Sequence, residues 1–425
     1  MTTFVVGYLM KDQLVLIIRW VLKRLAQATI WRFRPGVIAV TGSVGKTSAK
    51  YAIGAVLAAD RSVRISRGNF NNELGVSLGI LGDWGKIEGI FFWPKVILVG
   101  LWQLIVKSDY PELLVLEYGI DRPGDMKKLI AIAEPNVSVV TAIGDIPAHV
   151  EFFDGPERVV REKSRIIECL EPASFAVLNG DSAVVLGFRE RTRARVVTYG
   201  FGEENDVHIT EFENRIMDGR PVGISFRLGY AGNTVLVELD GVFGRAHAYA
   251  AAAGAAIGLV FALPLGKISE ALRAYRPPDG RMQLVAGPNE TLFLNDAYNA
   301  SPLSMEEALV TLKGLPAKRR VAVLGDMREI GTYAMEAHRK LGERVAKSAN
   351  ILVTVGPLAK FIAEGANKAG LRKNYIYSYD TAEESAPKLS ELIKKGDLVL
   401  MKASHAVGLE KLVEMFTPTP NRDSK

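Results

Sequence analysis

Cysteine is almost absent from this chain of 425 residues, in which Cys169 stands alone. One thiol cannot form a disulfide within the chain, so no disulfide framework supports the fold. None is required at this length, because two or three domains can each bury a hydrophobic core of their own. This cysteine usage is typical of a reducing compartment, and we expect a cytoplasmic protein.

Long uncharged apolar runs are also scarce. Lys11 and Asp12 interrupt the apolar N-terminal stretch and no small-residue cleavage site follows, so a signal peptide is not indicated. The most apolar segment, residues 89–106, contains Pro94 and Lys95 and reaches only the lower limit for a membrane-spanning helix. We interpret it as a helix that is buried or dips into a membrane interface beside the N-terminal helix. A transmembrane segment is the alternative.

Acidic residues are nearly missing at the N-terminus. Residues 1–36 contain six Lys and Arg residues against Asp12, which leaves +5 of the chain's net charge of +6 in this segment. The rest of the chain is therefore almost neutral, and a nucleic-acid-binding body is not indicated. Residues 13–27 have the pattern of a basic amphipathic helix, which either lies in a membrane interface or packs on the protein itself.

The stretch IAVTGSVGKTS, residues 38–48, carries the clearest chemical signal. An apolar β-branched run at 37–40 predicts a buried strand, a turn containing glycine follows, and a helix begins at Lys46. Glycines let successive N–H groups point at phosphate oxygens, and the helix N-terminus adds partial positive charge. The general P-loop pattern has glycine where this chain has Val40, but the rest of the pattern still predicts an ATP site.

Each residue of this loop has an expected role. Lys46 would reach the β- and γ-phosphates of ATP, and the Thr47 hydroxyl would bind Mg²⁺. The residues expected to hold ATP in this loop are Gly42, Ser43, Gly45, Lys46, Thr47 and Ser48.

Asparagines gather in the segment that follows, residues 64–81. Asn69, Asn71 and Asn72 precede an apolar helix whose first turn holds Glu73. Such residues can simply form a turn and a helix cap. Because the P-loop is close in sequence, we favour a loop that faces a ligand.

Two further segments end in candidate metal ligands. LLVLEYGI (113–120) predicts a buried strand with Glu117 near its carboxyl end, and residues 136–153 predict a strand followed by a loop with His149. Ligands bind at the carboxyl ends of parallel strands in open α/β folds. Together with the Thr47 hydroxyl, these side chains offer oxygen and nitrogen ligands for divalent cations that bridge ATP phosphates.

The remaining pattern predicts an α/β protein. Residues 195–240 alternate like strands, residues 247–262 form a helix of small residues that must pack closely, and a proline-rich turn then marks a boundary. Beyond it, strands and helices alternate again. We predict a short amphipathic segment at 1–36, a central P-loop ATPase domain with a parallel sheet at 37–277, and a Rossmann-like C-terminal domain at 278–425.

These segments together resemble the Mur ligase family. The strings TGSVGKTS, GNFNNELG, LEYG, EKSRI, VLNGD, NDAYNASP, LGDMREIG and KAS occur in the family's order over residues 37–412. NDAYNASP and LGDMREIG favour the member that forms the last amide bond over the other amino-acid-adding ligases and over folylpolyglutamate synthase. The resemblance implies an ATP-dependent carbon–nitrogen ligase of peptidoglycan precursor synthesis, and therefore of cell-wall biogenesis, cell shape and cell division. It would add D-alanyl-D-alanine or a similar amine to a muramyl-peptide carboxylate through an acyl phosphate.

The resemblance also implies roles for individual residues. The catalytic set would be Lys46, Glu117, His149 and Lys163. Mg²⁺ would be held by Thr47, Glu117, His149 and a carbamylated Lys163, which without the resemblance we would interpret as a solvated helix residue. Beyond the P-loop, the nucleotide would contact Asn179, His247, Arg281 and Asp296. The substrates would contact Asn69, Asn71, Asn72, Tyr298, Asn299, Asp326, Lys402 and His405. The two domains would close on the nucleotide, hinged near Pro277.

The chain departs from the family at positions that would bind the substrates, so the identity of the donor and of the acceptor is not decided by the resemblance. Only about 36 residues precede the P-loop strand, too few for the family's N-terminal UDP-binding domain. This suggests a membrane-near or lipid-linked donor, and a soluble donor gripped by a partner protein fits too. His247 and Ala250 stand where asparagines usually read the adenine. Near the C-terminus a KGSR-like string is replaced by KASH at 402–405, so the acceptor could differ from D-alanyl-D-alanine.

Three functions therefore remain in view. The first is the cell-wall ligase, and the second is a related ligase with a different or lipid-linked peptide substrate. The third is a non-catalytic scaffold that binds nucleotide, which the joint presence of all the catalytic residue types disfavours. A further hypothesis is peripheral membrane contact through residues 1–36 and 89–106, at the inner face of the membrane; contact of the N-terminal helix with protein is the alternative.

Overall fold

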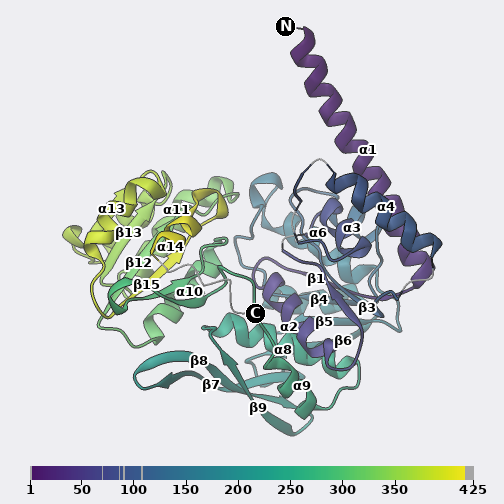
Figure 1. Cartoon of the computed structure of the whole chain (residues 1–425). Coiled ribbons are helices and arrows are strands. Elements are labelled where there is room, and N and C mark those ends of the chain that lie inside the picture. Colours follow the sequence, from purple (N-terminus) through teal and green to yellow (C-terminus); the bar gives the residue numbers. More distant parts are fainter. Residues whose placement is uncertain (1, 69, 86, 90, 107–108, 417–425) are drawn as a thin grey trace.

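Two β-sheets organise the chain. The computed structural model describes residues 2–68, 70–85, 87–89, 91–106 and 109–416, with side chains from residue 15 onward. A nine-stranded sheet forms from the first part of the chain and a six-stranded sheet from the last part, and each is covered by helices (Figure 1). This confirms the predicted α/β class with two sheets.

The first sheet is parallel around β1, the strand that precedes the P-loop. Its strand order is β2-β3-β1-β4-β5-β6-β7-β8-β9, with parallel pairing from β2 to β7 and antiparallel pairing among β7, β8 and β9. The strands are β1 (Gly36–Thr41), β2 (Val63–Ile65), β3 (Leu113–Glu117), β4 (Val137–Val140), β5 (Phe175–Asn179), β6 (Arg195–Gly200), β7 (Val207–Met217), β8 (Arg220–Tyr230) and β9 (Asn233–Asp240).

Helices bury both faces of this sheet. Val37 and Ala39 of β1 belong to one hydrophobic core and Ile38 and Val40 to the other, as the two-residue period of a strand requires. The helices of this part are α2 (Lys46–Ala58), α3 (Glu73–Leu81), α5 (Asp125–Ile130), α6 (Pro156–Glu168), α7 (Ala183–Leu186), α8 (Arg245–Val260) and α9 (Leu265–Leu272).

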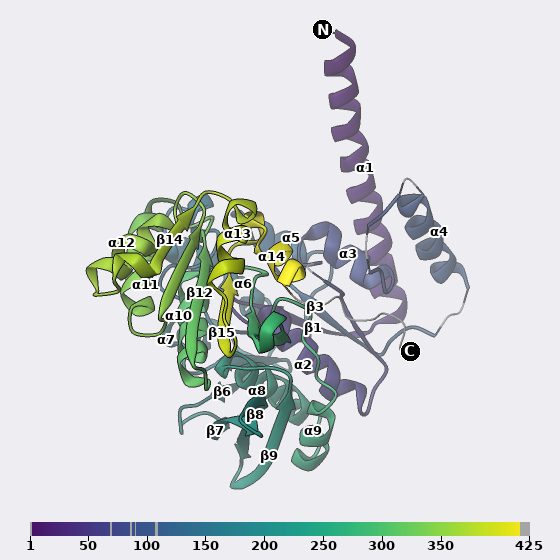
Figure 2. The same ribbon diagram turned by 60° about the vertical axis from the view of Figure 1, so that its left-hand side comes forward.

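The predicted small-residue helix does pack closely. It is α8, which lies against α2, the helix of the P-loop (Figures 1 and 2). A Cβ placed on Gly254 would lie 3.0 Å from the carbonyl oxygen of Ala52, so the two backbones approach at a point where only glycine fits easily. This contact fixes the P-loop helix against the body of the domain.

The second sheet has the Rossmann-like pattern expected for the C-terminal domain. Its order is β10-β11-β15-β12-β13-β14, and every pair is parallel except β10 with β11. The strands are β10 (Gln283–Ala286), β11 (Leu292–Asn295), β12 (Arg319–Gly325), β13 (Ile351–Val355), β14 (Ile376–Tyr379) and β15 (Asp397–Lys402). The helices are α10 (Pro302–Gly314), α11 (Ala334–Val345), α12 (Lys360–Lys368), α13 (Ala382–Leu392) and α14 (Leu409–Phe416).

The N-terminal helix is much longer than the segment predicted from its amphipathic pattern. α1 (Thr2–Phe33) packs on α3 and α4 in its second half, where Leu22, Leu25 and Ala26 are buried, and its N-terminal end extends away from the body (Figures 1 and 2). The interpretation of this helix as packed on the protein is therefore right for the second half. It is wrong for the stretch that includes Leu16 and Trp20, whose side chains are exposed.

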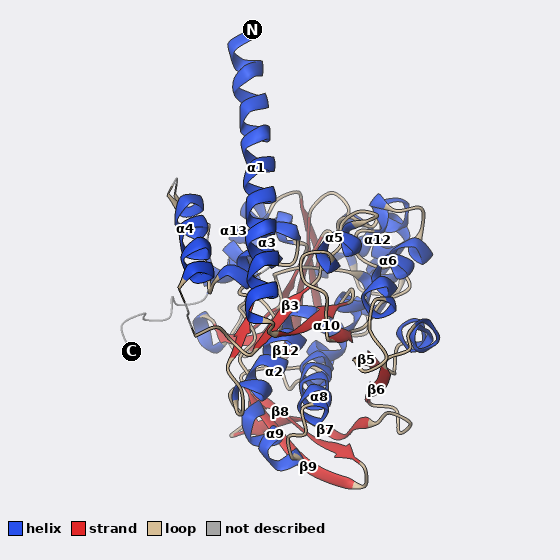
Figure 3. Ribbon diagram, turned by 90° about the vertical axis from the view of Figure 1, so that its right-hand side faces the viewer, coloured by secondary structure: helices blue, strands red, loops and turns tan. Residues whose placement is uncertain are grey.

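The apolar segment at 89–106 forms α4 (Phe92–Ile105), which lies beside α1 as expected (Figure 3). Only one face of α4 is buried, through Phe92, Val96 and Gly100, so a fully buried helix is a wrong interpretation. Among the described residues, no helix combines the length and the apolar character that crossing a bilayer requires.

Candidate active site

The predicted strand, loop and helix of the P-loop are confirmed. The loop connects β1 to α2, and the backbone N–H groups of Ser43 and Val44 donate to the carbonyl oxygen of Ala142 beyond β4. Gly45 has a φ of 86° and Gly42 a φ of 142°, and a Cβ on Gly42 would lie 2.0 Å from a side-chain oxygen of the neighbouring strand end. Glycine is therefore required at both positions for the loop to curl around the start of α2.

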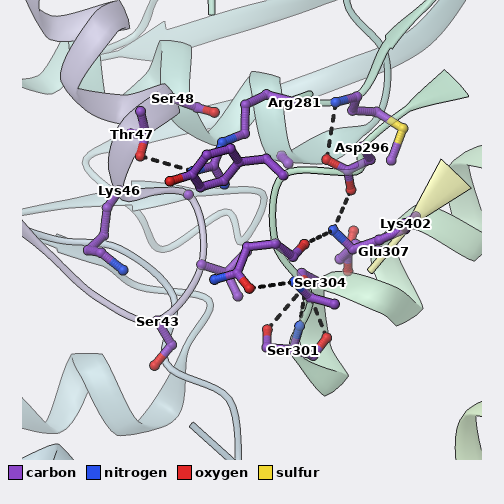
Figure 4. Close-up of a pocket in the computed structure, with 18 of the residues that line it drawn as sticks. Ser43, Lys46, Thr47, Ser48, Arg281, Asp296, Ser301, Ser304, Glu307 and Lys402 are labelled. Atoms are coloured by element: carbon purple, nitrogen blue, oxygen red, sulfur yellow. Dashed lines mark hydrogen bonds and ion pairs between the residues drawn. The ribbon is translucent and has the colours of Figure 1, made fainter. Parts of the chain in front are cut away.

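A cavity of about 200 Å³ lies at the N-terminus of α2, and residues of the C-terminal domain line its opposite side (Figure 4). The residues predicted for the site that line this cavity are Ser43, Gly45, Lys46, Thr47, Ser48, Asn71, Glu117, His149, His247, Arg281, Asp296, Tyr298, Asn299 and Lys402. Most of the expected site is thus brought together from segments that are far apart in sequence.

The cavity has the chemistry of an anion site. The N-terminus of α2 contributes partial positive charge, and Lys46 stands beside it. Within the part of the chain that the structure describes, the buried hydroxyl oxygen of Ser43 has no hydrogen-bond partner. Buried polar atoms are rarely left unpaired, so this hydroxyl is available to a bound phosphate oxygen.

Two lysines share one carbonyl oxygen beneath the loop. Nζ of Lys46 lies 3.0 Å and Nζ of Lys163 2.9 Å from the carbonyl oxygen of Gly42. Burial lowers the pKa of both amines, and the positive charge of Lys46 lowers that of Lys163 further, to well below its ordinary value. Lys163 is 1% exposed, so its interpretation as a solvated helix residue, made without the family resemblance, is wrong.

Glu117 ends β3 at the floor of the cavity. Its carboxylate accepts hydrogen bonds from the Thr47 hydroxyl at 2.9 Å and the Asn71 amide at 3.3 Å, and it forms an ion pair of 3.3 Å with Lys50. Burial alone would raise the pKa of Glu117, but Lys50 and Lys46 together hold it below its ordinary value. The carboxylate is therefore ionised, and the Thr47 hydroxyl is held beside it.

Lys50 is a site residue that the sequence analysis missed. Its amine is completely buried and also donates to the carbonyl oxygen of Gly68 at 3.0 Å, so it ties Glu117 to the asparagine loop. The available signal was its spacing, because residues four apart on a helix lie on one face and Lys46 already faces the site.

The three asparagines have different positions. Asn71 lines the cavity, whereas the side chain of Asn72 accepts from the backbone N–H of Gly75 at 3.0 Å and caps α3. Of the two readings of this loop, a cap fits Asn72 and a ligand-facing residue fits Asn71. Asn69 lies outside the described residues.

His149 contacts the C-terminal domain. Its Nδ1 lies 2.6 Å from a carboxylate oxygen of Glu329, and its Nε2 lies 3.6 Å from one of Asp121. In the described parts of the chain, no group of three or more His, Cys, Asp or Glu side chains is arranged to hold a metal ion. A cation in this cavity would therefore need further ligands beside Glu117, such as the Thr47 hydroxyl or phosphate oxygens.

The C-terminal domain contributes a second charged group. Asp296 accepts from the backbone N–H of Met282 at 3.1 Å and from Nζ of Lys402 at 2.5 Å, and Lys402 also donates to the carbonyl oxygen of Asn299 (Figure 4). Burial lowers the pKa of Lys402, and the nearby carboxylate opposes this shift. The pair presents a buried ammonium and a carboxylate across the cavity from the P-loop.

Arg281 connects the two sides of the site. Its guanidinium donates to the Thr47 hydroxyl at 3.3 Å and lies 4.2 Å from the ring centre of Tyr298, so it stacks on the aromatic face (Figure 4). A fixed positive charge is thereby placed between the P-loop helix and the C-terminal domain.

A larger cavity of about 770 Å³ adjoins the first one across Val44 and Gly45. Its walls include the apolar and aromatic side chains of Ile143, Tyr199 and Tyr249. Asn179 lies here rather than in the first cavity. This second space has the lining expected for a planar base, next to the phosphate site.

Two residues predicted to contact substrate do not line either cavity. Asp326 accepts hydrogen bonds from the backbone N–H groups of Leu358 and Ala359, just before α12. His405 is exposed, lies against Glu410 and stacks on Tyr298. Asp326 therefore caps the start of the α12 segment, His405 lies behind the lining residue Tyr298, and their contact with substrate stays a prediction.

The fold and the site define a class of protein. A P-loop at the carboxyl edge of a parallel sheet faces a second α/β domain, and residues of both domains line one cavity (Figure 4). This is the arrangement of a nucleotide-binding enzyme that brings a phosphate donor and a second substrate together between domains.

Comparisons with known proteins narrow this class. The Mur ligase middle domain matches residues 98–258, and the glutamate ligase domain of Mur ligases matches residues 280–405. UDP-N-acetylmuramoyl-tripeptide–D-alanyl-D-alanine ligase of Synechocystis is 30% identical over 390 residues, which is 91% of this chain and 75% of the relative. The Bacillus subtilis enzyme of the same name is 28% identical over 401 residues, 94% of this chain and 79% of the relative.

Solved structures agree. MurF from Acinetobacter baumannii matches with a TM-score of 0.77 and 26% identity, covering 93% of this chain and 79% of the other. MurF ligase from Thermotoga maritima in complex with ADP matches with a TM-score of 0.75 and 27% identity, covering 93% and 82%. The chain belongs to the Mur ligase family.

Proposed function

We propose that this protein is an ATP-dependent ligase of peptidoglycan precursor synthesis that joins a muramyl-peptide carboxylate to D-alanyl-D-alanine. The observation that carries this proposal is the shared cavity, in which the P-loop of the central domain faces the Asp296–Lys402 pair of the C-terminal domain. A protein that only binds nucleotide would need the P-loop but not this second charged pair. The choice of substrates is supported by relatives of this chain whose names state this reaction.

The reaction follows from these groups. The substrate carboxylate attacks the γ-phosphorus of ATP, and ADP leaves as an acyl phosphate forms. The amine then attacks the acyl carbon and loses a proton, and the tetrahedral intermediate expels phosphate to give the amide. Lys46, the N-terminus of α2 and Arg281 would hold and neutralise the phosphates, so catalysis is mainly positioning and electrostatic stabilisation.

A magnesium ion fits the residues that are present. The Thr47 hydroxyl and the ionised Glu117 carboxylate adjoin each other at the cavity, and oxygen donors of this kind suit Mg²⁺. When bound, Mg²⁺ would neutralise charge on the transferred phosphoryl group. We propose that these two residues hold it together with ATP, with His149 as a further ligand once it is released from Glu329.

Lys163 fits a carbamate. Its buried amine has a pKa well below the ordinary value, so it is neutral over a wider pH range than an exposed lysine and can add CO₂. A carbamate would place a negative charge beside Lys46, where a charged Lys163 ammonium would be repelled. We propose that Lys163 acts in this form in the ligase.

The direct test is ATP-dependent phosphate release by the purified chain with Mg²⁺. The donor would be UDP-linked muramyl tripeptide or its lipid-linked counterpart, each with and without D-alanyl-D-alanine. Release that needs the UDP donor and the dipeptide supports the proposal. Phosphate release only with the lipid-linked donor would change the assigned donor substrate. If neither donor gives more phosphate release than the Lys46→Met variant does, the proposed ligase activity on these substrates is wrong.

We also propose peripheral contact with an anionic membrane through α1 and α4. Leu98, Leu101, Trp102 and Ile105 repeat at the spacing of one helix face, and they are 66%, 43%, 57% and 79% exposed. The opposite face of α4 packs on the protein. Contiguous exposed apolar surface of this kind marks an interaction site.

The charge around this face favours lipid over a protein partner. Arg19, Arg24 and Arg32 are exposed on α1, the helix that packs against α4, and Lys95 is exposed on α4 itself. Trp20 of α1 and Trp102 of α4 are exposed as well. Basic residues with tryptophan at the edge of an apolar face are typical of helices that lie in a membrane interface.

Flotation with vesicles tests this contact. The chain should float with vesicles containing phosphatidylglycerol, less with neutral vesicles, and less in high salt. Replacing Leu98, Leu101 and Ile105 together by Gln should abolish flotation, whereas Leu236→Gln, an exposed apolar residue on β9, should not. Equal flotation of both variants, or flotation that ignores lipid charge, would overturn the proposal in favour of a protein partner for this face.

A further inference from the structure

His247 is fully engaged inside the protein. The ring is 1% exposed at the start of α8, with Nδ1 at 2.8 Å from the Tyr275 hydroxyl and Nε2 at 3.0 Å from the carbonyl oxygen of Arg281. The family resemblance gives this position to adenine recognition. Both ring nitrogens are used elsewhere, however, and His247 does not line the larger cavity whose walls suit a base.

The hydrogen-bond directions in this group follow from simple chemistry. Burial lowers the pKa of His247 to about 4, so the ring is neutral near pH 7 and has one donor and one acceptor nitrogen. A carbonyl oxygen can only accept, so Nε2–H donates to Arg281 and Nδ1 accepts from the Tyr275 hydroxyl. The Tyr275 oxygen is itself hydrogen-bonded to Ser48 in the first turn of α2.

These bonds form a continuous connection from the P-loop helix to the backbone of Arg281. The same arginine extends its guanidinium back to the Thr47 hydroxyl and stacks on Tyr298. The backbone of Arg281 is thus anchored to the residue that follows Thr47, and its side chain to Thr47 itself. The position of the guanidinium over the phosphate site depends on both anchors.

We propose that His247 and Tyr275 are a positioning pair that holds Arg281 over the phosphates, and that His247 does not read the adenine base. This inference rests on the proposed function, because it assigns Arg281 to the transferred phosphoryl group. The pair contributes to turnover through Arg281: His247 borders the P-loop cavity, but both of its ring nitrogens are already hydrogen-bonded within the protein.

The central experiment compares His247→Asn and Tyr275→Phe with the wild type. Positioning predicts that both variants lower kcat for phosphate release roughly tenfold or more, because a charge that stabilises the transition state is displaced. The Kd for ATP should change less than kcat. The ratio of the Kd values for ATP and GTP should stay at the wild-type value, because no contact to the base is lost.

Arg281→Ala provides the coupling test. If the pair acts only through Arg281, then adding Tyr275→Phe to Arg281→Ala should cause little further loss of kcat, which is non-additivity of residues in one network. Tyr377→Phe, whose hydroxyl donates to a backbone oxygen far from the site, is the matched control and should leave kcat unchanged. Tyr275→Phe keeps the buried ring, so the test survives if His247→Asn does not fold.

Two results would overturn the inference. One is a collapse of the ATP preference over GTP in His247→Asn, which would restore base recognition. The other is full additivity of the Tyr275→Phe and Arg281→Ala losses. The Kd values for ATP and GTP can be measured without a second substrate. They therefore test whether His247 recognises the base even if the proposed ligase reaction is wrong.

Discussion

At the scale of single residues, the site is built on buried charges that compensate one another. Glu117, Lys46 and Lys50 lie within one small region beneath the P-loop, and burial shifts the pKa of each. A buried charge that loses its partner is far more costly than the pair itself, because its desolvation is no longer offset. Lys50 is therefore as important to this arrangement as the P-loop lysine.

Replacing Lys50 by Met should destabilise the protein by about 3–5 kcal/mol, because it leaves the Glu117 carboxylate buried with one partner fewer. Urea unfolding measures this, with exposed Lys340→Met as the control. The double variant Lys50→Met with Glu117→Gln should recover a part of the loss. If the single variant unfolds at the wild-type urea concentration, the ion pair does not stabilise the fold.

The same pair predicts a pH dependence of stability. The pKa of Glu117 is lower in the folded state than its ordinary value of 4.5, so its contribution is present above that value and is lost as pH falls through the folded pKa. Between pH 6 and about pH 3, the wild type should lose more unfolding free energy than Glu117→Gln. If the unfolding free energies of the two proteins fall equally with pH, Glu117 does not have a lowered pKa in the folded state.

Lys163→Ala should abolish turnover while leaving ATP binding largely intact, because the proposed carbamate acts on the phosphoryl transfer and the P-loop remains. Removing CO₂ from the buffer should lower wild-type activity, and bicarbonate should restore it. Exposed Lys128→Ala is the control. Unchanged turnover in Lys163→Ala, or activity that ignores CO₂, would remove the carbamate role.

The residues near the P-loop could be predicted from sequence, because strand, glycine turn and helix start follow one another within eleven positions. Contacts across the fold could not. Thr47 and Arg281 are 234 residues apart, and Asp296 and Lys402 are 106 apart, so only the family resemblance suggested that they meet. The resemblance also assigned His247 to the base, but a neighbouring tyrosine and a backbone oxygen occupy both of its nitrogens.

At the scale of helices and strands, the contact of α2 with α8 explains how the P-loop is held rigidly. The alanine-rich pattern of α8 predicted close packing, and small residues on both helices permit it. The partial burial of α1 was less accessible, because Leu16 and Ile17 of the predicted apolar face at 13–27 are exposed, whereas Leu22 and Leu25 of the same face are buried.

Gly254→Val should destabilise the protein by about 1–3 kcal/mol, because its side chain would be forced against the backbone of α2 at Ala52. Gly266→Ala on α9 is the matched control, since a Cβ there has no neighbour within 4 Å. Thermal unfolding distinguishes the two. The nucleotide Kd should also rise in Gly254→Val, because a displaced α2 moves the P-loop; equal stability of both variants would contradict the packing argument.

At the scale of the whole molecule, the two domains meet on both sides of the phosphate site. One contact is Arg281 with Thr47, and another is the segment of His149 and Glu151 against Glu329. The sequence predicted closure hinged near Pro277, and this stays a prediction. A static arrangement with these contacts is consistent with a closed state that must open to exchange substrates.

A disulfide across this contact would test whether opening is part of the reaction. A Cβ on Gly331 would lie 3.4 Å from the Cβ of Glu151, close to the separation in disulfides. In a Cys169→Ser background, oxidised Glu151→Cys with Gly331→Cys should therefore turn over at least roughly tenfold more slowly than its reduced form, because product release requires opening. Reduction should restore the rate. Neither single variant should change its rate on oxidation. These two controls account for strain at the positive φ of Gly331 and for loss of the Glu151 carboxylate. Undiminished turnover in the fully cross-linked protein would show that the domains work without separating at this contact, and the hinge at Pro277 would then lose its role.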